Sequence, residues 1–157
     1  MESLKGFLRR HAGMSKAAFL AACPYPFLAS PPPGPGQRDQ GLFPGAWIVP
    51  LEKKDTTALD PSISLGRGTE NDLWIDDGSV SKQHCYFLRE DDLFQIADAN
   101  STNGTFVNGH PLAPHVPLTL RSGDRIGIGE SILFHFLFPG HVYDSLIRRV
   151  SEEKPAP

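Results

Sequence analysis

The sequence predicts an all-β fold built mainly from antiparallel strands. Three short polar clusters, at residues 65–68, 80–84 and 101–109, lie between apolar runs of strand length. Each cluster falls where a turn is expected, and the first and third clusters contain glycine. Between the second and third clusters, residues 85–88 and 93–96 flank a charged stretch, which is the pattern of a hairpin. The three clusters are therefore expected to be loops on one antiparallel scaffold.

Residues 1–23 are expected to form a helical extension. Apolar side chains recur there at three- and four-residue steps, and the basic residues lie on other faces. Gly13 weakens the middle of this pattern, and Ser15 is suited to cap a second helix. The apolar part is short and ends at Pro24, so we expect neither an exported protein nor a membrane span.

Residues 24–45 are predicted to be a linker, because their proline and glycine content suits neither a helix interior nor a sheet ladder. Within this linker, residues 25–28 are apolar enough to dock on a neighbouring domain. The domain itself is predicted at residues 46–140. Residues 141–157 are expected to form a short helix followed by a disordered tail.

The strands of the predicted domain are short apolar runs separated by turn residues. Trp47 lies in the first of these runs and is expected in the core. The last run ends the domain, and alternate residues along it share one face. The strands are predicted within residues 46–51, 63–65, 71–78, 85–88, 93–96, 118–120, 125–129 and 132–138.

The three polar clusters supply side chains that can donate hydrogen bonds to an anion. Arg67 offers a planar fork of donors, Ser81 a hydroxyl group and Lys82 a point charge. The glycine-containing turns expose backbone N–H groups that can form an anion-binding nest. If the loops converge at one end of the scaffold, this set suits a phosphate better than a carboxylate. Further side-chain donors in the clusters are Thr102, Asn103 and Asn108.

The order and spacing of these motifs resemble the forkhead-associated (FHA) domain. The Gly66–Arg67 pair is the first motif, Ser81 and His84 bound the second, and residues 102–109 are the third. The resemblance extends over about residues 43–140. It implies an FHA-type β-sandwich of about eleven strands that binds phosphothreonine peptides through loops at one end, without catalysis.

Carried over position by position, the resemblance implies that Arg67 and Ser81 contact the phosphate. It implies that Lys82 contacts the phosphate or the peptide, and that Thr102 and Asn103 contact the peptide main chain. A histidine at the start of an apolar strand is expected to hold neighbouring loops in register through hydrogen bonds. The residues assigned to structural support of the site are Gly66, His84, Gly104, Asn108 and Gly109.

Two other functions are compatible with parts of the sequence. A protein-interaction scaffold could use the same fold without phosphate, and loss of Arg67 or Ser81 would mark it, but both are present. A hydrolase could pair Ser81 with His84, but the sequence has no nucleophile elbow and no obvious acid partner. We therefore predict a phosphothreonine-binding signalling or adaptor module that is not an enzyme and needs neither cofactor nor metal.

Composition limits the partners and the setting. A net charge of −3 and an isoelectric point near 6.0 provide no broad basic surface, so nucleic acid is not expected as a partner. Cys23 and Cys85 suggest neither a disulfide nor a metal site, and a cytoplasmic protein is expected. The expected partner is a phosphothreonine-containing protein, either a Ser/Thr kinase or its substrate.

Residues 53–60 also suggest phosphorylation-dependent self-association. Thr57 follows two lysines that suit a basophilic kinase. Its phosphate could bind Arg67 of a second molecule. The alternative is that this segment is a solvated loop with incidental threonines.

Overall fold

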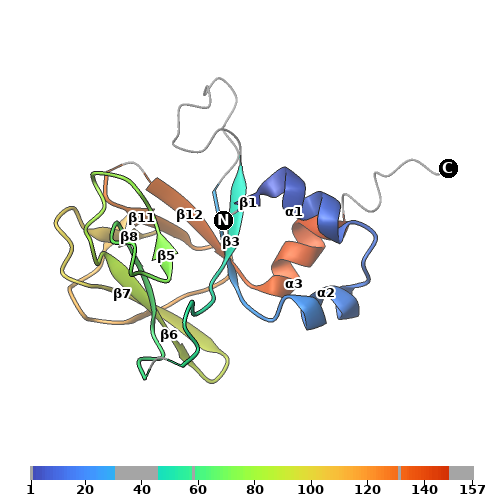
Figure 1. Ribbon diagram of the computed structural model, residues 1–157, viewed down its shortest axis with the longest axis horizontal. Coiled ribbons are helices and arrows are strands. Elements are labelled where there is room, and N and C mark those ends of the chain that lie inside the picture. The colour runs from blue at the N-terminus through green and yellow to red at the C-terminus, as the bar shows by residue number, and fades with distance from the viewer. Residues whose placement is uncertain (1, 31–45, 58, 131, 149–157) are drawn as a thin grey trace. The chain divides into compact units, whose positions relative to one another are not determined.

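The computed structural model describes residues 2–30, 46–57, 59–130 and 132–148 (Figure 1). Its contacts divide the chain into two compact units, and each is described separately below. One unit is Glu52–Phe134, and the other joins Met1–Leu51 to His135–Pro157. The described residues contain twelve β-strands in two sheets together with short helices, where the sequence predicted about eleven strands. The predicted all-β class is confirmed.

The unit Glu52–Phe134 contains a five-stranded sheet in the order β10-β7-β6-β4-β5. Strands β4 and β5 pair in parallel, whereas the other neighbours are antiparallel. The predicted hairpin is confirmed as β6 and β7, which turn at Asp91 in the left-handed backbone region (φ 53°). The strand bounds are β4 Ile63–Gly66, β5 Leu73–Trp74, β6 Cys85–Glu90, β7 Leu93–Asp98 and β10 Leu118–Thr119.

The same unit contains a second group of strands in the order β12-β11-β8-β9. Alternate residues of β11 and β12 are buried, as the apolar alternation in the sequence requires. Fully buried residues of this unit include Phe87, Ile96, Ile126, Ile128 and Phe134. The strand bounds are β8 Thr105–Val107, β9 His110–Pro111, β11 Arg125–Ile128 and β12 Ile132–Leu137, the last of which continues into the other unit.

The other unit combines short helices with strands in the order β1-β3-β2-β12. The N-terminal residues are helical as predicted, except that Glu2–Ser3 is a strand. The first helix ends at His11, because Ala12 leaves the helical region with a ψ of 135°, and Gly13 follows with a φ of 84°. Ser15 caps the second helix as predicted, because its hydroxyl oxygen accepts the N–H of Ala18 at 3.2 Å. The bounds are β1 Glu2–Ser3, α1 Leu4–His11, α2 Lys16–Ala22, β2 Phe27–Ala29, β3 Trp47–Pro50, α3 Pro139–Val142 and η1 (a π-helix) Tyr143–Ile147.

Strand β2 lies inside the stretch that was predicted to be a linker, so the linker prediction at residues 24–45 is wrong for Phe27–Ala29. These three residues are buried, and they pair antiparallel with both β3 and β12. Pro26 lies just before this strand and has no N–H to donate. Its carbonyl oxygen still accepts the N–H of Leu51 at 2.8 Å, so the proline is compatible with the pairing. The rest of the predicted linker, residues 31–45, lies outside the described residues, and the predicted domain boundaries stay predictions.

The core of this unit is aromatic. The rings of Phe7 and Phe27 meet edge to face at 5.3 Å between centroids, and Phe19 packs against both. The predicted C-terminal helix is confirmed as α3 and η1, while the predicted disordered tail, residues 151–157, lies outside the described residues. The other buried members of the cluster are Ala29, Ile48, Val142 and Ile147.

Neither cysteine forms a disulfide bond. Burial raises the pKa of both the Cys23 and Cys85 thiols, so both are held as thiols. Among the described helices, none has the length and apolar character that crossing a membrane requires.

Candidate anion-binding site

The structure brings the loops of the three polar clusters together by direct hydrogen bonds within the unit Glu52–Phe134. The backbone N–H of Arg67 donates to the carbonyl oxygen of Ser81 at 2.9 Å, which joins the first loop to the second. The hydroxyl oxygen of Ser81 accepts the backbone N–H of Thr102 at 3.0 Å, and the amide of Asn103 donates to Ser79 at 2.9 Å. The second loop is thereby joined to the third.

The first loop depends on the absence of a side chain at Gly66. A Cβ atom at this position would lie 2.2 Å from the carbonyl oxygen of Lys82. This distance is too short for any side chain, so only glycine fits here. The same carbonyl accepts the side-chain amide of Asn71 at 2.6 Å, and that amide also donates to Gly68 at 2.8 Å. Asn71 is buried, and its two hydrogen bonds link the first loop to the second.

His84 joins the second and third loops from within the unit, where its side chain is fully buried. Its Nδ1 accepts the backbone N–H of Ser81 at 3.0 Å, and its Nε2 lies 2.8 Å from the carbonyl oxygen of Gly104. Because a backbone N–H can only donate and a carbonyl can only accept, the ring carries its proton on Nε2. His84 therefore fixes the spacing between Ser81 and the third loop.

The third loop is organised by the buried carboxylate of Asp98. It accepts hydrogen bonds from the Ser101 hydroxyl at 2.5 Å and the Thr105 hydroxyl at 2.7 Å. Burial alone would raise the pKa of this carboxyl group, but the hydrogen bonds from Ser101 and Thr105 outweigh it and hold the pKa below its usual range. Gly104 completes the turn with a φ of 90°, and its N–H donates to the Ser101 hydroxyl oxygen at 3.1 Å.

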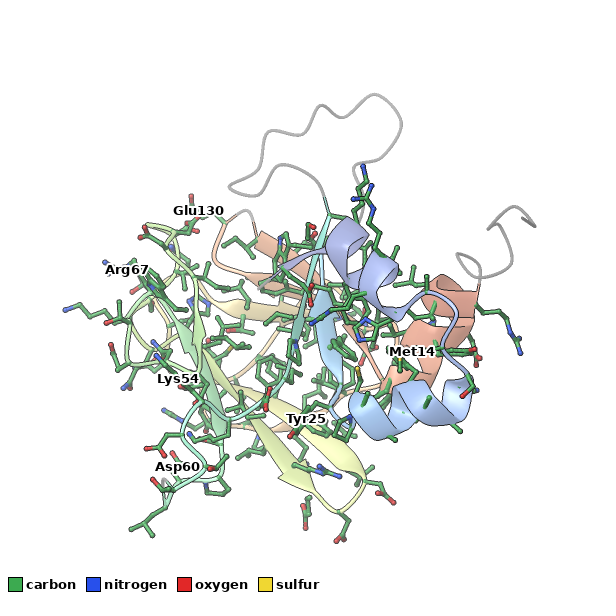
Figure 2. The ribbon with its side chains drawn as sticks, turned by 45° about the vertical axis from the view of Figure 1, so that its right-hand side comes forward. Met14, Tyr25, Lys54, Asp60, Arg67 and Glu130 are labelled. Atoms are coloured by element: carbon green, nitrogen blue, oxygen red, sulfur yellow. The ribbon has the colours of Figure 1, made fainter. Side chains whose placement is uncertain are left out.

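The converged loops leave cationic donors facing solvent. Arg67, labelled in Figure 2, is exposed, and its Nε donates to the carbonyl oxygen of Val80 at 3.0 Å. Among the described residues, its two terminal nitrogens and the ammonium group of Lys82 make no hydrogen bond or ion pair. The backbone N–H groups of Lys82 and Gln83 also make none within the described part of the chain. Thr102 and Asn103 are exposed beside them.

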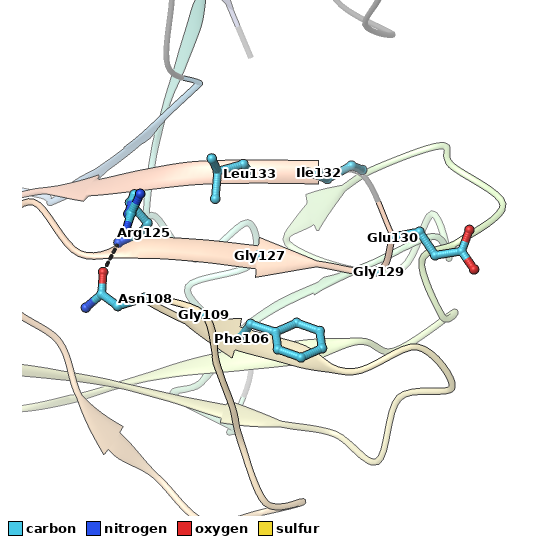
Figure 3. A pocket seen from close by; sticks show the side chains of 9 residues that line it. All are labelled: Phe106, Asn108, Gly109, Arg125, Gly127, Gly129, Glu130, Ile132 and Leu133. Carbon is cyan, nitrogen blue, oxygen red and sulfur yellow. Dashed lines mark hydrogen bonds between the residues drawn. The ribbon is translucent and has the colours of Figure 1, made fainter.

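Two residues assigned to structural support do not lie with this group. Asn108 and Gly109 follow β8, whereas the site loop precedes it, and they form the turn to β9 with φ values of 51° and 82°. Figure 3 shows Asn108 beside β11, where its side-chain oxygen accepts the backbone N–H of Arg125 at 3.0 Å. They line a shallow groove of about 570 Å³ on the face of β8, β11 and β12.

Two residues that help to build the site were missed by the sequence interpretation. Asn71 links the first two loops, and Asp98 orders the third loop. Ser79, which flanks the second cluster in the sequence, accepts the Asn103 amide through its backbone carbonyl. The signal in the sequence was a polar residue at the edge of an apolar strand. In the structure Asn71 and Asp98 are both buried at such positions. Such residues need partners, and those partners come from other loops. Among the described residues, no group of three side chains could hold a metal ion.

The fold and the loops define an all-β domain that presents a small cationic site at converging loops. Residues 63–129 match the family model of the FHA domain, and this chain therefore contains an FHA domain. The match begins at β4 and ends just after β11, so it includes all three site loops.

Curated relatives match the same region. The oxoglutarate dehydrogenase inhibitor of Corynebacterium diphtheriae is 41% identical over 70 residues, which cover 45% of this chain and 47% of that protein. The glycogen accumulation regulator GarA of Mycobacterium tuberculosis is 34% identical over 96 residues, which cover 58% of this chain and 57% of that protein. The chain thus spans about half the length of the curated relatives it matches.

Solved structures support the same fold. A structure described as a structural and functional analysis of phosphothreonine-dependent FHA domain interactions matches with a TM-score of 0.51 and 25% identity, covering 72% of this chain and 96% of that chain. The FHA domain of a hypothetical protein from Arabidopsis thaliana matches in fold with a TM-score of 0.53 and 23% identity, covering 73% of this chain and 85% of that chain.

Proposed function

We propose that this chain binds phosphothreonine peptides through the three converged loops. The observation that carries the proposal is the position of Arg67 and Lys82. Their free terminal nitrogens lie on loops that are tied to each other through Ser81. A phosphate dianion is the ligand best suited to a guanidinium fork, an ammonium group and a hydroxyl donor at one place.

Ser81 has the hydrogen-bonding capacity that this role needs. Its oxygen already accepts the N–H of Thr102, so its hydroxyl proton remains available to a phosphate oxygen. The backbone N–H of Lys82, which has no partner in the described part of the chain, supplies a further donor from the same turn. Arg67 keeps one guanidinium edge free of the described residues, because only its Nε donates to any of them.

Thr102 and Asn103 are proposed to contact the peptide main chain. Both are exposed, and both are fixed by hydrogen bonds to the second loop, at Ser81 and Ser79. A loop that is already ordered loses little conformational entropy when a peptide binds. The peptide would therefore be held by its phosphate and by its backbone. Such binding suits an adaptor, which holds its partner without modifying it.

The partner is proposed to be a phosphothreonine-containing protein, either a Ser/Thr kinase or one of its substrates. Two observations about similar proteins support this class. One similar structure concerns phosphothreonine-dependent interactions, and two relatives are named as an inhibitor of oxoglutarate dehydrogenase and as a regulator of glycogen accumulation. By this proposal the chain acts by binding rather than by catalysis.

The test is calorimetric titration with peptides that carry a central phosphothreonine and randomised flanking residues, beside the same peptides without phosphate. We expect binding of the phosphorylated peptides alone. Arg67→Ala should abolish most of it, and the matched variant Arg121→Ala, which removes another exposed arginine, should bind as the wild type does. Binding of the unphosphorylated peptides with equal affinity would instead establish the phosphate-independent scaffold.

A further inference from the structure

Trp74 is exposed to an unusual degree for a tryptophan, with 53% of its surface accessible. It lies on β5, next to Leu73 and Ile75, which are both buried. The alternation of the strand therefore turns its indole outward. An outward-facing aromatic ring that the fold does not need for its core is available to a ligand.

The indole is held beside the proposed phosphate site. Its Nε1–H donates to the carbonyl oxygen of Arg67 at 3.1 Å, and Trp74 pairs with Gly66 in the parallel ladder of β4 and β5. The ring is therefore attached to the same loop that presents the Arg67 guanidinium. The ring is within reach of a peptide bound at that guanidinium, because an extended chain advances about 3.3 Å per residue.

Two carboxylates come from the segments on either side of Trp74 in the chain, and neither has a partner among the described residues. Asp76 follows on the same outward alternation of the chain and is exposed. The carboxylate of Glu70 lies against Gly68, where an added Cβ would be 2.3 Å from its Oε1 atom. Among the described residues, neither carboxylate forms an ion pair or a hydrogen bond. An exposed indole and unpaired carboxylates from the same segments are together complementary to a cation.

We propose that Trp74, with Glu70 and Asp76, recognises a lysine or arginine side chain of the bound phosphopeptide, within about three residues of the phosphothreonine. This inference rests on the proposed function, and it makes Trp74 a specificity-determining residue. An arginine suits the site best, because its guanidinium can stack on the indole while its edge pairs with a carboxylate. An acidic residue at the same peptide position is disfavoured by both carboxylates.

The experiment is a calorimetric series with one phosphothreonine peptide in which positions −3 to +3 are changed one at a time to arginine, glutamine or glutamate. We expect one position at which arginine binds about three- to tenfold more tightly than glutamine, and glutamine more tightly than glutamate. Trp74→Ala should remove the arginine preference, so that the arginine and glutamine peptides bind this variant with equal affinity. Trp74→Phe should keep part of the preference, since it retains an aromatic face.

The matched control is Leu93→Ala, which removes a side chain with the same 53% exposure from β7 and should leave the arginine preference intact. Asp76→Lys should invert the preference at that position toward glutamate. An arginine preference that survives Trp74→Ala and Asp76→Lys would overturn the inference, as would the absence of any such preference in peptides that bind in an Arg67-dependent way. If no peptide binds in an Arg67-dependent way, the proposed function fails and this inference fails with it.

Discussion

The hydroxyl oxygen of Ser81 accepts the backbone N–H of Thr102 at a distance of 3.0 Å, although the two residues are twenty-one positions apart. This bond joins the loop proposed to hold the phosphate to the loop proposed to hold the peptide main chain. The phosphate-binding and peptide-binding parts of the site are therefore ordered together before any ligand arrives.

Ser81→Ala should weaken binding of a phosphothreonine peptide by about ten- to hundredfold, because a hydrogen bond to a charged group contributes about 1.5–3 kcal/mol. The free energy of unfolding should change by less than about 1 kcal/mol, since the freed Thr102 N–H is exposed to water. Calorimetric titration and urea unfolding measure the two quantities. A variant that binds as tightly as the wild type would remove Ser81 from the site.

His84→Ala should instead destabilise the domain, by about 2–4 kcal/mol. The substitution removes hydrogen bonds to Ser81 and Gly104 from a fully buried position and leaves a cavity there. The measurement is the urea midpoint, with His110→Ala, which truncates an exposed histidine, as the control. Unchanged stability in His84→Ala would contradict the structural role of this residue.

Phosphothreonine should bind more tightly than phosphoserine in otherwise identical peptides. The resemblance to FHA domains implies a small apolar pocket for the threonine methyl group, and burying one such group contributes about 0.8 kcal/mol. We therefore expect a difference between a few-fold and about tenfold. Equal affinities for the two peptides in calorimetry would show that no methyl pocket exists.

The stability contributed by Asp98 should disappear in acid. Its folded-state pKa is below the usual value, so the contribution is fully present above the unfolded pKa of about 3.9 and is lost as the pH falls through the folded pKa. Asp98→Asn should therefore be less stable than the wild type by about 1–3 kcal/mol at pH 7. The difference should shrink below about pH 4.

Urea midpoints at pH 7, 5, 4 and 3 measure this difference. Asp92→Asn, which changes an exposed carboxylate in the turn of the β6-β7 hairpin, is the control and should follow the wild type at each pH. A gap between the wild type and Asp98→Asn that stays constant from pH 7 to pH 3 would contradict the prediction.

Self-association through Thr57 stays a hypothesis with a direct test. Thr57 is exposed, and its hydroxyl donates to the carboxylate of Asp55 at 2.6 Å. Phosphorylation would replace that donor with about −1.5 to −2 charge and repel Asp55, which frees the loop to reach Arg67 of a second molecule. Sedimentation of the phosphorylated protein at tens of micromolar should show dimers.

Two variants are the controls for this measurement, and both should remain monomeric. One is Thr57→Ala treated with the kinase that phosphorylates Thr57 in the wild type, and the other is phosphorylated Arg67→Ala. Dimers that form regardless of Arg67, or a phosphorylated wild type that stays monomeric, would contradict self-association at this site. The segment would then be a solvated loop.

The sequence by itself determined the elements whose information is local. The hairpin of β6 and β7 follows from two apolar runs around a charged turn, and the cap of α2 follows from Ser15, which precedes it. The three site loops could be located for the same reason, because glycine and short polar residues favour turns wherever they occur. The FHA class follows from the order of those loops.

Only the tertiary structure decided which of these residues meet. Phe27–Ala29 is a strand because β3 and β12, which are distant in sequence, cover it on both sides. Asn108 and Gly109 belong to the same sequence cluster as Thr102, but the three residues of β8 carry them away from the site. Asn71 braces the site through carbonyls that the folded loops bring to it. Turn formation depends on neighbouring residues, whereas burial and hydrogen-bond partners depend on segments that fold together from distant parts of the chain.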